Sequence, residues 1–142
     1  MLREQKCKSL QLELISCLEN QGVVIKGARS LEGWDSPPLI ANDGYGSAKP
    51  RRADVIGFDK ARKCVVFGLV RPDRQSLDSE ESLEEYNVFL DQNAGSAEHA
   101  SRLYVILPEA LLGEFTSLIT HYIHRDYWHR IITVGSADRP AD

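Results

Sequence analysis

Apolar residues recur along the chain with two different periods, and each period predicts one type of element. Between residues 3 and 20 they fall on a single helical face, at Cys7, Leu10, Leu14, Cys17 and Leu18. Similar stripes predict two further helices, over residues 79–92 and 109–124. Runs of β-branched and other apolar residues predict five strands, over residues 23–29, 54–58, 63–70, 102–107 and 130–135.

These elements follow one another in the order αβββαβαβ, which predicts an α/β fold with a mixed sheet flanked by helices. Only residues 59–62 separate the second and third strands, so these two should form a hairpin. The stretches Val65 to Val70 and Tyr104 to Leu107 are almost continuously apolar, as expected for central strands that are covered on both faces.

The remaining segments predict one domain with a long internal loop. Residues 30–50 contain several glycines and prolines without a sustained period, which is typical of a loop. Residues 136–142 are polar and predict a flexible C-terminal tail. We therefore expect a single domain over residues 1–135.

The amino-acid composition predicts a globular protein rather than a membrane or disulfide-rich one. The 142 residues are 42% hydrophobic and 27% charged, as expected for one globular domain. No apolar run approaches the roughly 20 residues that cross a bilayer, and the first residues lack a secretory signal, so we expect a cytoplasmic protein with no membrane contact. Three cysteines without metal-site or disulfide spacing, Cys7, Cys17 and Cys64, should be reduced thiols within the core.

The formal net charge of −4 hides an asymmetry between the two halves of the chain. Residues 1–72 contain 12 Lys and Arg against 8 Asp and Glu, whereas residues 73–142 contain 5 against 13. A basic first half favours a polyanion-binding face, yet an isoelectric point near 5.6 argues against tight, indiscriminate DNA binding.

One short segment, the loop residues 49–52, concentrates positive charge. Lys49, Arg51 and Arg52 stand just before Asp54 in the sequence. Two interpretations stay open for these cations: contacts to nucleic-acid phosphates, or an ordinary solvated cluster.

The order of elements and two segments resemble the PD-(D/E)XK nuclease superfamily, which has the restriction-endonuclease-like fold. The stretch Arg51-Arg52-Ala53-Asp54-Val55-Ile56-Gly57-Phe58 resembles the strand that begins with a metal-binding Asp in that superfamily. The stretch Arg102-Leu103-Tyr104-Val105-Ile106-Leu107-Pro108-Glu109 resembles the later buried strand and the helix that follows it. The resemblance covers about residues 5–135 and implies Asp54 as the metal-binding position.

The chain departs from the superfamily where the resemblance implies a Glu-x-Lys motif on the third strand. Counting on from Asp54 places that motif at Gly68-Leu69-Val70, which has neither a carboxylate nor an amine. Nuclease chemistry of this class needs two or more carboxylates around Mg²⁺, so this departure predicts a degenerate catalytic site. Arg71 is the nearest cation, but strand alternation points it away from positions 68 and 70 unless the strand ends before it.

A relocated metal site is the alternative to a degenerate one. Glu13, Asp73 and Glu80 are the candidate carboxylates that would join Asp54 in it. Each of them is also compatible with a solvated surface charge. Asp54 itself has two open interpretations, a vestigial metal ligand or a carboxylate that binds backbone amides at the start of a strand.

Histidines near the predicted third helix are a second, weaker candidate for a metal site. His121 and His124 lie on one helical face, with His129 and Asp126 nearby, which is compatible with a metal site or with a solvated helix end. The lack of a second ligand pair with zinc spacing favours the solvated helix end. No cofactor is therefore expected, apart from Mg²⁺ if a nuclease site is active.

Three functional interpretations follow from these observations. The favoured one is a catalytically degenerate, nuclease-like domain that acts as a binding or scaffolding module, with DNA or a DNA-processing protein as its partner. The second is an active Mg²⁺-dependent endonuclease with a relocated site that includes Asp54. The third is a protein-interaction or oligomerisation domain that binds no nucleic acid. Under the first interpretation, Lys49, Arg51, Arg52 and Arg71 are the candidate nucleic-acid contacts.

Overall fold

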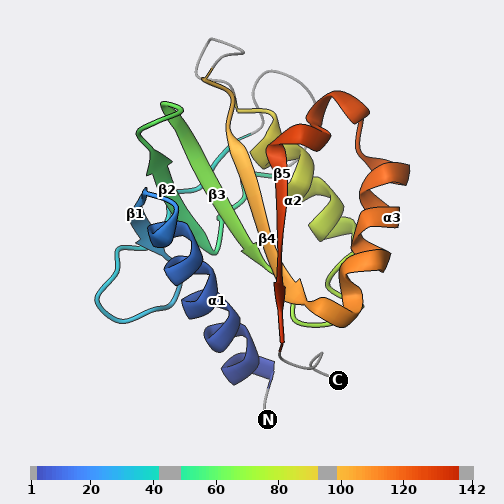
Figure 1. Cartoon of the computed structure of the whole chain (residues 1–142), viewed down its shortest axis with the longest axis horizontal. Helices are drawn as coiled ribbons and strands as arrows, with labels where there is room; N and C mark the ends of the chain where they lie inside the picture. Colours follow the sequence, from blue (N-terminus) through green and yellow to red (C-terminus); the bar gives the residue numbers. More distant parts are fainter. Residues whose placement is uncertain (1–2, 42–48, 93–98, 138–142) are drawn as a thin grey trace.

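A five-stranded mixed sheet lies at the centre of the molecule, between helices on its two faces (Figure 1). The computed structural model describes residues 3–41, 49–92 and 99–137. Its elements are α1 (Arg3–Asn20), β1 (Val23–Ala28), β2 (Val55–Asp59), β3 (Cys64–Val70), α2 (Glu80–Leu90), β4 (Arg102–Pro108), η2 (Glu109–Leu111), α3 (Leu112–Tyr122), η3 (Arg125–Arg130) and β5 (Ile131–Ser136). The predicted α/β class and the order of the main helices and strands are confirmed.

The strands lie in the order β1-β2-β3-β4-β5, and the pairing changes from antiparallel to parallel at β3. β1, β2 and β3 form an antiparallel meander, whereas β4 and β5 continue the sheet in parallel. The predicted hairpin is confirmed, with Val55 opposite Gly68 and Asp59 opposite Cys64. A parallel neighbour must be reached by a crossover, and α2 provides that connection between β3 and β4.

Each face of the sheet packs against its own helices. α1 covers one face, and α2 and α3 cover the other (Figure 1). Along β3, alternate residues enter the two cores: Val66 and Val70 face α1, whereas Phe67 stacks on Phe89 of α2 with ring centroids 4.7 Å apart. Burial on both faces explains why β3 and β4 are so continuously apolar, and confirms them as the central strands.

The region after β4 differs in detail from the prediction of one helix over residues 109–124. It begins as the 3₁₀ turn η2, whose last residue Leu111 gives α3 no side-chain cap, and α3 ends because Ile123 is extended. A second 3₁₀ segment, η3, was not predicted. His124 initiates it by accepting the backbone N–H of Asp126, so a local side-chain contact rather than periodicity defines this segment.

The long loop agrees with the prediction over the residues that the structure describes, whereas the last strand is longer than predicted. Residues 30–41 and 49–50 contain no helix or strand. β5 extends one residue beyond the predicted strand, so that Ser136 is buried in the sheet rather than part of a tail. The rest of the predicted tail from residue 138 onward lies outside the described residues.

Two further expectations concern cysteines and membranes. All three cysteines are free, with Cys64 buried and the other two half-buried. Burial raises the pKa of the Cys64 thiol, which keeps it protonated and poorly nucleophilic. Among the described residues, no helix combines the length and the apolar composition needed to cross a membrane.

Candidate functional site

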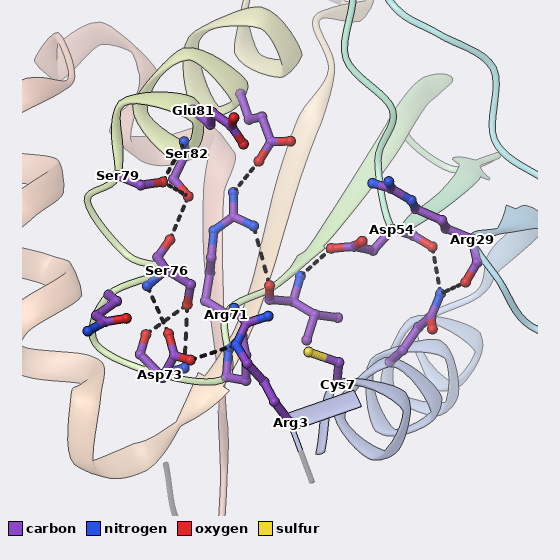
Figure 2. A pocket seen from close by; sticks show the side chains of 15 residues that line it. Arg3, Cys7, Arg29, Asp54, Arg71, Asp73, Ser76, Ser79, Glu81 and Ser82 are labelled. Atoms are coloured by element: carbon purple, nitrogen blue, oxygen red, sulfur yellow. Dashed lines mark hydrogen bonds and ion pairs between the residues drawn. The ribbon is translucent and has the colours of Figure 1, made fainter. Parts of the chain in front are cut away.

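A polar basin opens at the end of the sheet where β1 and β3 end and β2 begins (Figure 2). It consists of two adjoining cavities of about 520 and 620 Å³. The cavities share five lining residues, Arg3, Cys7, Gln11, Arg29 and Asp54. The first half of α1 and the end of β1 form one wall of the basin, the α1 wall. The start of α2 and the segment after β3 form the other, the α2 wall.

Gln11 holds the floor of this basin together. Its side-chain amide donates to the carbonyl of Arg29 at 2.9 Å and to the carbonyl of Asp54 at 2.8 Å. The backbone N–H of Arg29 also donates to the Asp54 carbonyl, at 2.8 Å. The buried Gln11 side chain therefore ties α1 to the end of β1 and to the residue that precedes β2. Sequence analysis did not single it out, although a polar residue between Leu10 and Leu14 on a core-facing helix was a signal.

Asp54 sits in the basin immediately before β2. Its Oδ2 accepts the backbone N–H of Val70 at 2.8 Å, which is the amide-binding role that the sequence analysis considered. Burial raises the pKa of the Asp54 carboxyl, while the Val70 N–H and the positive charge of Arg71 act in the opposite direction. The Asp54 carboxylate is thus half-buried and bound to the backbone rather than fully exposed to solvent.

Position 68, where the resemblance implies the Glu of a Glu-x-Lys motif, is closely packed. Gly68 lies opposite Val55 in the sheet, and a Cβ atom added to it would stand 2.8 Å from Leu14 Cδ2 and 3.2 Å from Val55 Cβ. Val70 reaches the basin as an apolar side chain. β3 therefore supplies neither a carboxylate nor an amine beside Asp54.

Arg71 also lines the basin, and its side chain points toward α2, opposite to Gly68 and Val70, which face α1, as strand alternation predicts. Its buried guanidinium donates from Nη2 to Glu85 Oε1 at 2.6 Å and from Nε to the Tyr86 hydroxyl at 3.0 Å. Nη1 donates to the Val70 carbonyl at 3.3 Å, and the guanidinium carbon lies 5.1 Å from the centre of the Tyr86 ring. These contacts hold a positive charge next to the segment that binds Asp54.

Of the three acids considered for a relocated site, only Asp73 lines the basin. Its carboxylate accepts from Arg3 Nε at 2.8 Å and from the backbone N–H of Ser76 at 2.9 Å. Burial acts to raise the pKa of Asp73, but these hydrogen bonds outweigh it and the net shift is downward. Glu13 and Glu80 are exposed on their helices and do not line the basin.

The acids of the basin do not fit a Mg²⁺ ion. Over residues 3–41, 49–92 and 99–137, no three His, Cys, Asp and Glu side chains are grouped so that they could hold a metal. Asp73 and Glu85 are each engaged by an arginine, and a hard cation needs several oxygen ligands that are not held in this way. The histidine constellation is exposed, and within it His124 Nδ1 lies 3.4 Å from Asp126 Oδ2 and accepts the backbone N–H of Asp126.

The basic cluster near Asp54 in sequence lies elsewhere in space. Neither Lys49, Arg51 nor Arg52 lines the basin. Arg51 forms an ion pair with Glu84 of α2, and Arg52 Nε donates to the carbonyl of Pro37 at 2.8 Å. These two arginines therefore hold the long loop and α2, and of the three cations only Lys49 is exposed.

Different cations surround Asp54. Arg3, Lys8 and Arg29 lie on the α1 wall, and Figure 2 shows Arg29 next to Asp54. Lys8 and Arg29 are exposed, and neither side chain has a hydrogen bond or ion pair with any residue in the described part of the chain. The α1 wall therefore carries positive charge that is available to an anion.

No protein-family model, no curated protein and no solved structure matches this chain. The fold and the basin are therefore the observations from which its function is inferred. The basin combines the half-buried carboxylate of Asp54, an α1 wall with a net positive charge and a mixed α2 wall, which is compatible with binding an anionic ligand. Among the residues that the structure describes, no group of three His, Cys, Asp and Glu side chains accompanies this arrangement.

Proposed function

We propose that this chain is a catalytically degenerate member of the PD-(D/E)XK nuclease superfamily that binds nucleic acid without cleaving it. Two features support the kinship. A helix precedes an antiparallel meander, and a crossover helix then leads to a strand parallel to the last one of the meander. Asp54 stands directly before the second strand, where the resemblance implies the metal-binding acid.

The proposal that catalysis is lost rests on the close packing of Leu14 against Gly68. Leu14 is fully buried and fills the space that a side chain at position 68 would need. A second carboxylate therefore has no place beside Asp54 on β3. Without a pair of free carboxylates, Mg²⁺ lacks the oxygen ligands with which it activates water and stabilises a phosphate.

The cations of the α1 wall support binding of nucleic acid. Lys and Arg side chains are common contacts to nucleic-acid phosphates, and such contacts position a protein without reading sequence. On this wall the cations Arg3, Lys8 and Arg29 outnumber one acid, Glu4, whereas on the α2 wall the acids Asp73, Glu81 and Glu85 outnumber one cation, Arg71. The phosphate backbone is therefore expected to run along α1 and the end of β1.

Salt-dependent binding of labelled DNA tests this function. Each phosphate contact contributes a slope of about −0.9 to the plot of log K against log salt concentration for duplex DNA. The double variant Lys8→Gln/Arg29→Gln should lose about two contacts, so its slope should be shallower by about 2. Fluorescence anisotropy of labelled duplex and branched DNA at several salt concentrations measures the slope.

A matched control removes the same charge from the opposite end of the sheet. Lys60 and Lys63 are exposed in the turn between β2 and β3. Lys60→Gln/Lys63→Gln should weaken binding only slightly and leave the slope almost unchanged. Equal effects of the two double variants would contradict a site on the α1 wall, and absence of binding at low salt would contradict the proposed function.

A further inference from the structure

The α2 wall of the basin presents hydrogen-bond acceptors next to a buried donor. Among the described residues, Arg71 makes three hydrogen bonds, to Tyr86, Val70 and Glu85, although a guanidinium has five N–H groups. Glu85 uses Oε1 for its bond to Arg71, and Glu81 is an exposed acid that also lines the cavity. Figure 2 shows Glu81 on the same side of the basin as Arg71. This wall can therefore accept and donate hydrogen bonds at one place.

The cavity on this side has the size of a small-ligand site. Its volume is about 520 Å³, and small-molecule sites typically have about 300–1,000 Å³. A DNA duplex is too wide to enter such a cavity, whereas a single nucleotide is small enough. The basin continues from this cavity directly to Lys8 and Arg29 on the α1 wall, because the two cavities share Asp54 and other residues.

We infer that the basin holds one unpaired nucleotide, with its phosphate on the α1 wall and its base on the α2 wall. This inference rests on the proposed nucleic-acid binding and adds a ligand class to it. Lys8 and Arg29 face the phosphate, while Arg71, Glu81 and Glu85 face the edge of the base. The net positive charge of the α1 wall then suits the phosphate, and the hydrogen-bond acceptors and donor of the α2 wall suit the polar edge of the base.

The acceptors of the α2 wall select a base with an exocyclic amine. A glutamate accepts from the N4 amine of cytosine, and Arg71 donates to an acceptor on the same base edge. Thymine and uracil have a carbonyl oxygen where cytosine has its amine, so that oxygen would face a carboxylate. Uracil differs from cytosine mainly at this group, so a pair of oligonucleotides that contain one or the other isolates the contact.

Binding of oligo(dC) and oligo(dU) tests the inference. Ten-nucleotide single strands with a fluorescent label are titrated with the full chain at pH 7.5 and low salt. The unsubstituted protein should bind the dC strand about tenfold more tightly, the effect of one well-placed base contact. Glu81→Gln should reduce this preference to about twofold, because a glutamine amide can also donate to uracil.

Glu80→Gln is the matched control, because Glu80 is exposed on the same helical turn but does not line the basin. It removes the same charge and should keep the tenfold preference. Equal binding of both strands, or equal loss of preference in both variants, would overturn the inference while leaving the proposed function intact. Absence of binding to either strand and to duplex DNA would overturn the proposed function as well.

Discussion

The carboxylate of Asp54 accepts the backbone N–H of Val70 at 2.8 Å, across the end of the hairpin that β2 and β3 form. Asp54 is the acid that the resemblance implies as a metal ligand. One of its two carboxylate oxygens therefore already accepts a hydrogen bond from the sheet. Arg71 follows Val70 and brings its positive charge to the same basin. Asp54 thus has a structural contact that does not depend on a metal ion.

Asp54→Asn should leave the protein at least as stable as the unsubstituted chain at pH 7. Burial raises the pKa of Asp54 in the folded state, so the stability from this group is complete below its unfolded pKa and is lost as pH rises through its folded pKa. Asparagine keeps an acceptor for the Val70 N–H and does not ionise. Urea unfolding from pH 3 to pH 8 should show the two proteins converging at the acid end.

Asp54→Ala is the control for that hydrogen bond. It leaves the Val70 N–H without its acceptor, which should cost about 1–3 kcal/mol of unfolding free energy at every pH. A loss of stability in Asp54→Asn as large as that in Asp54→Ala would show that the charge, and not the acceptor, stabilises the fold.

The Asp54→Asn change should also strengthen nucleic-acid binding. It removes a negative charge near Arg29, and a charge at this kind of site changes binding by about threefold to tenfold. The gain should shrink as pH falls and the native carboxyl becomes protonated. Anisotropy titrations at pH 5 and pH 8 measure it, and weaker binding by the variant would place the phosphates outside the basin.

Introducing the Glu-x-Lys motif that the resemblance implies should not produce cleavage. Gly68→Glu must displace the buried Leu14 side chain and bury a charge in an apolar core, so the variant should lose about 3 kcal/mol of stability. Gly68→Glu/Val70→Lys should be no more active on DNA with Mg²⁺ than the unsubstituted chain. A stable double variant that cuts DNA would contradict the conclusion that Leu14 closes this position.

Arg71→Met should be among the most destabilising changes at the basin. The substitution leaves Glu85 and the Tyr86 hydroxyl without their buried partner, and breaking one side of a buried ion pair costs about 3–5 kcal/mol. Arg74→Gln, which breaks the exposed pair with Glu114, should change the unfolding midpoint far less. Similar midpoints for the two variants would show that Arg71 is not a structural anchor.

Arg51→Ala should act on stability rather than on DNA affinity. Arg51 is mostly buried and paired with Glu84, so its loss should lower the free energy of unfolding by about 1 kcal/mol. The salt slope of DNA binding should not change, because Arg51 does not line the basin. Thermal unfolding and the same anisotropy titrations separate the two effects, and a shallower slope would restore the loop residues 49–52 as a phosphate site.

The elements with a strong period could be predicted from the sequence, and the contacts that build the site could not. α1 and the central strands β3 and β4 follow from the positions of their apolar residues. η3 was missed because it depends on one contact of His124. Arg51 is near Asp54 in sequence but turns toward Glu84, whereas Arg29 reaches Asp54 from β1. Sequence distance alone does not distinguish these two arginines, because only the register of β1 and β2 brings Arg29 next to Asp54.

One mixture of protein and labelled branched DNA tests the central claim, binding without cleavage. The full chain is incubated with this DNA at low salt in Mg²⁺ and, separately, in Mn²⁺, and each sample is divided between a native and a denaturing gel. The account predicts a retarded complex on the native gel and only intact strands on the denaturing gel. Cleavage products from the unsubstituted chain that are absent with Asp54→Ala would contradict it, because they would show that Asp54 serves an active metal site.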